Sequence, residues 1–119
     1  MIVGIGIDLV DLEHMQSVVE KTPRIINRIL TQEELTIYES RSEKRKLEFL
    51  AGRFAAKEAF GKAMGTGIGK FVSFQNVVVL NDEQGCPYVA ASPFDGKAFV
   101  SISHSRQMAI AQITLERRG

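Results

Sequence analysis

Residues 50–69 read LAGRFAAKEAFGKAMGTGIG, and this stretch predicts the longest element of the chain. Ser42 is a good helix N-cap and Gly65 is a natural C-cap. The residues between them favour a helix, apart from two glycines. We therefore expect one long helix over residues 43–64. The glycine-rich residues 65–69 that follow it predict a flexible loop.

A charged pair lies on a face of this helix that should be packed. At 3.6 residues per turn, one stripe of the helix contains the apolar residues Leu47, Leu50, Ala51 and Phe54. Glu58 lies at the centre of the same stripe, and Lys62 lies at its margin. The two can be an ordinary i,i+4 pair, worth about 0.2–0.5 kcal/mol. A partly buried carboxylate costs free energy unless something offsets it, so a bound metal or phosphate is the alternative.

The residues before this helix predict a strand followed by shorter helices. Residues 2–7 alternate glycine with branched residues, which predicts a short buried strand that ends at Asp8. Residues 12–21 predict a helix, which a proline then breaks, and residues 24–30 form a turn or a short helix. A threonine with a glutamate three residues later is a capping-box signature and predicts a helix over residues 32–39.

The residues after the long helix predict an antiparallel sheet. Strands are expected at residues 74–80 and 87–91, and residues 97–103 and 108–115 alternate around a tight turn, as in a hairpin. The order of elements predicts an α+β fold, with an N-terminal strand and helices packed on a small antiparallel sheet. A chain of 119 residues is sufficient for one domain, so we expect a single domain over residues 1–119.

Composition narrows the class of function. The formal net charge of +1 argues against a nucleic-acid binder, which usually has a marked basic excess. The single cysteine, Cys86, cannot form an internal disulfide, and we expect it to be structural. The apolar residues 2–10 are too short to span a bilayer and lack a basic leader. We therefore expect a cytoplasmic protein that binds no membrane.

Two further segments contain candidate site residues. Asp8 is either the N-cap of the first helix or a metal ligand at the end of a strand. Together with Glu58 it would suit Mg²⁺, which prefers hard oxygen ligands. The sequence Ser-Ile-Ser-His-Ser at residues 101–105 is either a polar hairpin turn or a set of donors to phosphate oxygens.

The first helical region is basic. Lys21, Arg24 and Arg28 form either a solvated face or a docking face for an acidic protein, because complementary charge speeds encounter and orients a partner.

Three motifs follow one another along the chain: GIGIDLV at residues 4–10, FAAKEAFGKA at residues 54–63 and SISHS at residues 101–105. Their order and spacing, and the length of the chain, resemble the holo-acyl-carrier-protein synthases. These proteins are the short branch of the 4′-phosphopantetheinyl transferases. The resemblance covers essentially the whole chain. It implies the α+β fold of that family and a homotrimer with one active site at each subunit interface.

The resemblance also implies an activity. Such an enzyme transfers phosphopantetheine from coenzyme A to a serine of apo acyl carrier protein in fatty acid biosynthesis, and releases 3′,5′-ADP. Asp8 and Glu58 match the family's Mg²⁺ ligands, and Lys62 matches the lysine that contacts the reacting phosphate. The resemblance assigns the coenzyme A nucleotide to Arg53, Gly65, Pro87, Ser103 and His104, with the Ser-His segment supplied by the neighbouring subunit.

The carrier-facing residues would be His14, Lys21, Arg24 and Arg28. Family members commonly have arginine where this sequence has His14, so this departure bears on carrier preference. Two other interpretations stay open from the pattern alone. One is a non-catalytic module that binds coenzyme A, and the other is a purely structural trimer.

Overall fold

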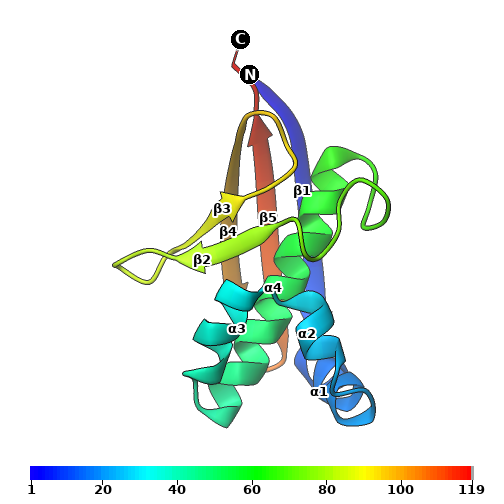
Figure 1. Ribbon diagram of the computed structural model, residues 1–119, viewed down its shortest axis with the longest axis vertical. Coiled ribbons are helices and arrows are strands. Elements are labelled where there is room, and N and C mark those ends of the chain that lie inside the picture. The colour runs from blue at the N-terminus through cyan, green and yellow to red at the C-terminus, as the bar shows by residue number, and fades with distance from the viewer. Residues whose placement is uncertain (119) are drawn as a thin grey trace.

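Helix α4, Glu43–Met64, runs through the middle of the molecule and packs on one face of a three-stranded sheet (Figure 1). At its start the Ser42 hydroxyl accepts a hydrogen bond from the N–H of Arg45 at 3.5 Å. At its end Gly65 has a φ of 81°, in the left-handed region that favours glycine. The predicted helix is confirmed with the predicted bounds. The structure, a computed structural model, describes residues 1–118.

The sheet is antiparallel, and its strand order is β1-β5-β4. Its strands are β1 (Ile2–Asp11), β5 (Met108–Glu116) and β4 (Lys97–His104). The predicted hairpin of the last two strands is confirmed, and β1 pairs with the other side of β5. Asp8 lies opposite Ala111, which lies opposite Ile102 on β4. This register places Asp8 at an edge of the sheet.

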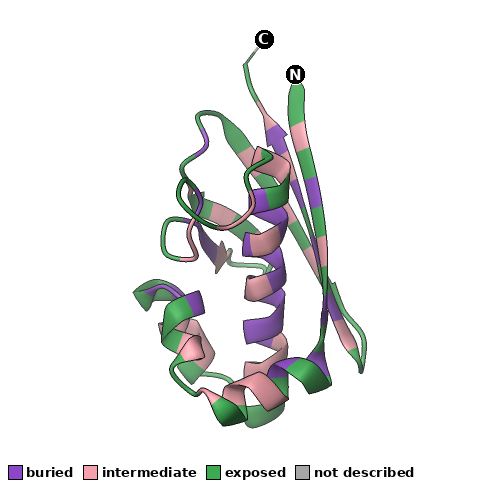
Figure 2. Ribbon diagram, turned by 90° about the vertical axis from the view of Figure 1, so that its right-hand side faces the viewer, coloured by how far each residue is buried: buried purple, intermediate pink, exposed green. Residues whose placement is uncertain are grey.

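The remaining elements surround α4 on the side away from the sheet and at its N-terminal end. They are α1 (Leu12–Lys21), α2 (Ile25–Ile29), α3 (Gln32–Glu39), and a second, two-stranded sheet of β2 (Val78–Asn81) and β3 (Pro87–Ala91). Figure 2 shows α4 between the three-stranded sheet and these shorter elements. These helices and two antiparallel sheets confirm the predicted α+β class. Among the described residues, no helix combines the length and apolar character that crossing a membrane requires.

Strand β1 differs from the prediction in three ways. It runs to Asp11 instead of ending at Asp8, and its branched residues are exposed instead of buried; Ile5, for example, is 62% exposed. The glycines are the residues that face α4. The N-cap of α1 is Asp11, whose side chain accepts from the His14 N–H at 2.9 Å, so the interpretation of Asp8 as a helix cap is wrong.

Glycine on the inner face of β1 permits very close contact with α4. A Cβ atom added at Gly6 would overlap the carbonyl oxygen of Ala59, and one added at Gly4 would overlap that of Ala63. Real Cβ atoms never approach so closely, so any larger residue would force the strand and the helix apart. The alternation of glycine with branched residues therefore reflects a backbone-to-backbone contact and not a buried apolar strand.

A buried ion pair lies on the other side of α4. The ammonium of Lys57 is 2.6 Å from Oε1 of Glu34, and neither side chain is exposed. The ammonium also donates to the carbonyls of Ile29 and Phe74, each at 2.7 Å. Burial lowers the pKa of Lys57, and the Glu34 carboxylate opposes that shift. All three ammonium hydrogens therefore have an acceptor, as a buried charge requires.

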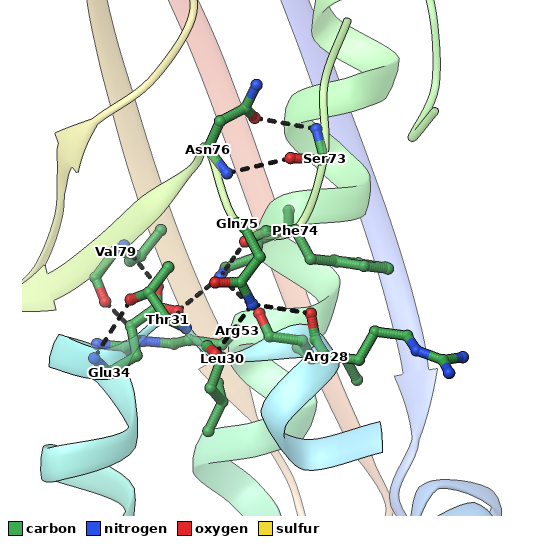
Figure 3. Close-up of polar contacts among 12 residues, drawn as sticks. Arg28, Leu30, Thr31, Glu34, Arg53, Ser73, Phe74, Gln75, Asn76 and Val79 are labelled. Atoms are coloured by element: carbon green, nitrogen blue, oxygen red, sulfur yellow. Dashed lines mark hydrogen bonds and ion pairs between the residues drawn. The ribbon is translucent and has the colours of Figure 1, made fainter. Parts of the chain in front are cut away.

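Glu34 joins this lysine to two more segments, and Figure 3 labels Glu34 together with its partners Thr31 and Val79. Its Oε1 accepts from the backbone N–H of Thr31 at 2.8 Å, which completes the predicted capping box. Its Oε2 accepts from the backbone N–H of Val79 at 2.7 Å, at the start of β2. Strand β2 begins only at Val78, so the predicted strand over residues 74–80 is wrong in its first half. There the chain bends instead, and the carbonyl of Phe74 reaches Lys57.

Replacing Lys57 by methionine leaves the Glu34 carboxylate buried without its counter-charge. We expect Lys57→Met to lower the free energy of unfolding by about 3–5 kcal/mol in urea denaturation. The control is Lys46→Met, which removes an i,i+3 pair with Glu43, whose side chain is 94% exposed, and should cost less than about 1 kcal/mol. A loss for Lys57→Met no larger than that of the control would contradict the structural role of the buried pair.

Candidate active site

Two predicted carboxylates and a lysine come together where α4 crosses β1. The Lys62 ammonium is 2.9 Å from Oδ1 of Asp8 and 3.0 Å from the backbone carbonyl of Ile7. Glu58 lies one turn earlier on α4, on the same side as Lys62. The Lys62 side chain is 53% exposed and that of Asp8 is 16% exposed. The cluster is thus partly buried and still open to a ligand.

The two carboxylates influence each other. Burial raises the pKa of the Glu58 carboxyl above its ordinary value, and the negative charge of Asp8 raises it further. The ammonium of Lys62 opposes both effects. Glu58 is therefore a stronger base than an exposed glutamate, and an additional cation at this position would be stabilised by both carboxylates.

The donor atoms in this cluster fit Mg²⁺ better than a transition metal. Within residues 1–118 no group of three or more His, Cys, Asp or Glu side chains is placed to hold a metal ion. A zinc site would require three or four such ligands. Mg²⁺ is commonly held by one or two carboxylates and takes its other ligands from water and substrate phosphate. Asp8 and Glu58 would supply the hard oxygen atoms of that pattern.

A second group of predicted residues lines a small groove between α4, β3 and β4. The groove has a volume of about 220 Å³ and brings together Arg53, Pro87 and His104. The His104 Nδ1 is 3.6 Å from Oε2 of Glu48 on α4. Arg41 and Arg45 also line this groove, and the sequence analysis did not name them. The basic run RSEKRK, which begins at Arg41, is the signal that could have found them.

Arg53 is the most enclosed cation of the groove. Its Nε donates to the carbonyl of Val79 at 3.1 Å, and its guanidinium donates to Oδ1 of Asn81 at 2.6 Å. The guanidinium also lies over the ring of Phe49, 4.1 Å from its centroid. Burial lowers its pKa to about 10, although Glu34 opposes the shift. Arg53 is thus held by protein contacts, whereas Arg41 and Arg45 are exposed.

Two predicted nucleotide-binding residues do not join this groove within one chain. Gly65 caps the far end of α4, twelve residues beyond Arg53, and at 1.5 Å per residue that is about 18 Å along the axis. Ser103 is exposed on β4, and its side chain points to the opposite face of the sheet from that of the next residue, His104. Within one chain, therefore, Gly65 and Ser103 lie apart from the groove that Arg53, Pro87 and His104 line.

The two groups lie on opposite sides of α4. Arg53 and Lys62 are nine residues apart, and this spacing rotates their side chains by about 180° around the helix axis. A larger hollow of about 620 Å³ between α1 and α4 contains none of the predicted site residues. The predicted carrier-facing residues His14, Lys21, Arg24 and Arg28 are all exposed, on α1 and α2.

Comparison with known proteins gives a consistent result. A family model described as the 4′-phosphopantetheinyl transferase superfamily matches residues 4–113. Holo-(acyl-carrier-protein) synthase of Enterococcus faecalis is 60% identical over 116 residues, which are 98% of each chain. That of a Geobacillus species is 56% identical over 117 residues, again 98% of each chain.

Solved structures agree with this result. A crystal structure of the Bacillus anthracis synthase in complex with CoA (3′,5′-ADP) matches with a TM-score of 0.92 and 46% identity, covering 99% of both chains. That of the Neisseria meningitidis synthase matches with a TM-score of 0.90 and 35% identity, covering 98% of this chain and 100% of the other. The chain is therefore an enzyme of the 4′-phosphopantetheinyl transferase superfamily and belongs to its holo-(acyl-carrier-protein) synthase family.

Proposed function

We propose that this chain transfers the 4′-phosphopantetheine group of coenzyme A to a serine of apo acyl carrier protein and releases 3′,5′-ADP. The observation that carries the proposal is the cluster of Asp8, Glu58 and Lys62, a partly buried acid–base site beside an open surface. The names of the relatives support it, as does the ligand of the Bacillus anthracis structure. The whole chain, including residue 119 outside the described part, would act as one domain.

The proposal extends to the place of the reaction in the cell. A carrier of fatty acid biosynthesis in the cytoplasm is the expected acceptor. Cys86 is exposed and has no disulfide partner, which suits a reducing compartment. The expectation that Cys86 has a structural and not a chemical role stays a prediction, and its exposed side chain is not part of the core.

In the proposed reaction the carrier's serine hydroxyl attacks the β-phosphorus of coenzyme A, and the bond to the 3′,5′-ADP oxygen breaks. Glu58 is the candidate to accept the serine proton, because its raised pKa brings it closer to that of a useful general base. Lys62 uses two of its three ammonium hydrogens for Asp8 and Ile7. The third is available to a phosphate oxygen, where it would stabilise the charge that develops during transfer.

Asp8 and Glu58 would hold Mg²⁺ through their carboxylate oxygens. When bound, the ion supplies positive charge that offsets the charge of the coenzyme A pyrophosphate. A carboxylate has two oxygens, so Glu58 can contribute one to the ion and keep the other for a proton. The proximity of two carboxylates to a single ammonium supports this assignment, because their mutual repulsion falls when a cation binds.

The reaction itself is tested by intact-mass spectrometry of apo acyl carrier protein incubated with this enzyme, coenzyme A and Mg²⁺. We expect the carrier to gain the mass of one phosphopantetheine, and we expect EDTA to abolish the gain. Restoring an excess of Mg²⁺ should restore transfer. An unmodified carrier in the presence of folded enzyme would refute the proposed transfer, and transfer that persists in EDTA would refute the role of the metal.

Removing either carboxylate should stop transfer and leave the fold intact. We expect Glu58→Gln and Asp8→Ala each to lower kcat by at least roughly 100-fold, the usual contribution of a general base or metal ligand. Glu83→Gln on the β2–β3 turn is the matched control and should keep wild-type kcat. Circular dichroism confirms folding. If a folded variant kept more than a tenth of the wild-type kcat, the substituted residue would not belong to the site.

The groove around Arg53, Pro87 and His104 is proposed to take the nucleotide end of coenzyme A, with Arg41 and Arg45 available to its 3′-phosphate. This groove and the carboxylate cluster lie on opposite sides of α4, so one chain does not bring them together. A homotrimer supports a complete site, because a ring joins two different surfaces of neighbouring protomers. Ser103 and His104 would then come with the groove from one subunit, and Gly65 with the carboxylate cluster from its neighbour.

The outer face of the three-stranded sheet is the proposed trimer surface. Its exposed apolar residues include Ile5, Ile7 and Leu9 on β1, Phe99 on β4 and Ile110 on β5. Ile7 is 54% exposed and Leu9 is 58% exposed, which is unusual for branched residues that share one face of a sheet. Association of three copies would remove this apolar surface from water.

A charge in this face should separate the subunits. We expect Ile7→Arg to elute as a monomer in size-exclusion chromatography with light scattering, and to lose most transfer activity with the assembly. Phe71→Arg is the control for oligomeric state, because Phe71 is 64% exposed and lies outside the sheet. A trimeric Ile7→Arg protein would place the subunit interface elsewhere, and a fully active monomer would refute shared sites.

The carrier is proposed to dock on α1 and α2. His14 and Lys21 on α1, with Arg24 and Arg28 at α2, present exposed basic groups to an acidic carrier. Lys21, Arg24 and Arg28 would provide most of the attraction.

A further inference from the structure

Helix α2 is too short to hold its position alone. It contains five residues, Ile25–Ile29, and its N-cap, Arg24, makes no side-chain capping bond. Isolated helices of this length are not stable in water, because the free-energy cost of nucleation exceeds the stabilisation from so few hydrogen bonds. Its orientation must therefore come from contacts with other parts of the chain. Ile25, Ile26 and Ile29 pack in or against the core, and the polar contacts lie at its C-terminal end.

The carbonyl groups at that end are satisfied by two side chains from distant segments. The side-chain amide of Gln75 has its Nε2 3.2 Å from the carbonyl oxygen of Asn27, 3.0 Å from that of Arg28 and 3.1 Å from that of Leu30. The carbonyl of Ile29 accepts from Lys57 instead. The last carbonyls of a helix have no partner within it, and here Gln75 and Lys57 act as their cap.

The chemistry of Gln75 suits this role. An amide NH₂ group carries two hydrogens, so it can divide them among three carbonyl oxygens, whereas its own oxygen would be repelled by all three. Figure 3 shows the Gln75 amide reaching toward Arg28 and Leu30. The contact therefore depends on the donor at the end of the side chain and not on its apolar stem.

The backbone around Gln75 is held in place before the amide reaches α2. Ser73 and Asn76 exchange hydrogen bonds, from Ser73 N–H to Oδ1 of Asn76 at 2.9 Å and from Asn76 N–H to Oγ of Ser73 at 3.2 Å (Figure 3). The ring of Phe74 stacks on that of Phe54 on α4, with centroids 5.6 Å apart. Gln75 thus extends from a segment that is tied to the catalytic helix.

We infer that Gln75 is a positioning residue, which acts through α2 to hold Arg24 and Arg28 where the carrier meets them. The inference rests on the proposed function, because it assigns these exposed arginines to carrier docking. Gln75 itself need not touch the carrier or coenzyme A. Its loss should weaken docking while the carboxylate cluster on the other part of α4 stays intact.

The test uses Gln75→Met, which keeps the length of the side chain and removes the donor. We expect the KM for apo carrier to rise roughly threefold to tenfold, the effect of one or two modest hydrogen bonds. The KM for coenzyme A and kcat should stay within about twofold of wild type. Gln32→Met, the same substitution at an exposed position of α3, should change none of the three constants.

A double-mutant cycle separates positioning from general stability. In a protein that already carries Arg24→Ala and Arg28→Ala, Gln75→Met should raise the carrier KM by no more than about 1.5-fold, because the groups it positions are absent. Gln75 does not act through these arginines if the effects of the substitutions on the carrier KM multiply. The same holds if the KM for carrier and the KM for coenzyme A rise equally, and either result overturns the inference.

Hydrogen exchange gives a result that does not depend on transfer. In Gln75→Met the amides of Arg28 and Leu30 should exchange at least threefold faster than in wild type, while those in the middle of α4 are unchanged. Unchanged exchange at α2 would overturn the inference even if the carrier KM rose. If the wild-type enzyme transferred nothing, the proposed function would fail and the docking role with it, whereas exchange would still report whether Gln75 fixes α2.

Discussion

The arrangement of this protein depends on a single buried ammonium group. Lys57 has three hydrogens, and each has a different acceptor: a side chain on α3, the end of α2, and the bend before β2. A buried charge is tolerated only when its partners are complete, so these segments must keep one fixed relation to α4. The same helix carries Glu58 on one side and Arg53 on another. The lysine that fixes the fold and the candidate site residues Glu58 and Arg53 are therefore on the same helix, α4.

Local signals were sufficient to predict the helices. The caps at Ser42, Thr31 and Gly65 fix helix ends through interactions within a few residues, and those ends are where the sequence places them. The burial of Lys57 could not be predicted in this way. The expectation of one packed stripe singled out its neighbour Glu58, but α4 is enclosed by a sheet, by helices and by a loop, so its buried surface is much wider than a stripe. The register of glycine on β1 was misread for a similar reason, since its partner is a distant helix.

The residues of the candidate site also differ in whether local sequence could predict their position. Motif spacing named Asp8, Glu58 and Lys62, and these three lie together because one strand and one helix turn suffice to place them. The groove proposed for the nucleotide depends on β3 and β4, which are distant from α4 in sequence. Arg41 and Arg45 were therefore missed, and Gly65 and Ser103 lie elsewhere. Family membership follows from the comparisons. The exposed apolar face of the sheet, and the position of the two groups of site residues on opposite sides of α4, support the proposed assembly.

The contact of Gly6 with Ala59 has a consequence for how the enzyme tolerates sequence change. Most distances in a protein core are set by layers of side chains, and they drift when those side chains are exchanged for larger or smaller ones. Asp8 and Glu58 are carried by a strand and a helix whose main chains touch directly. The distance between this strand and this helix is therefore set by the dimensions of the peptide group, which no substitution alters. Substitutions elsewhere in the core can accumulate while the two carboxylates keep their separation.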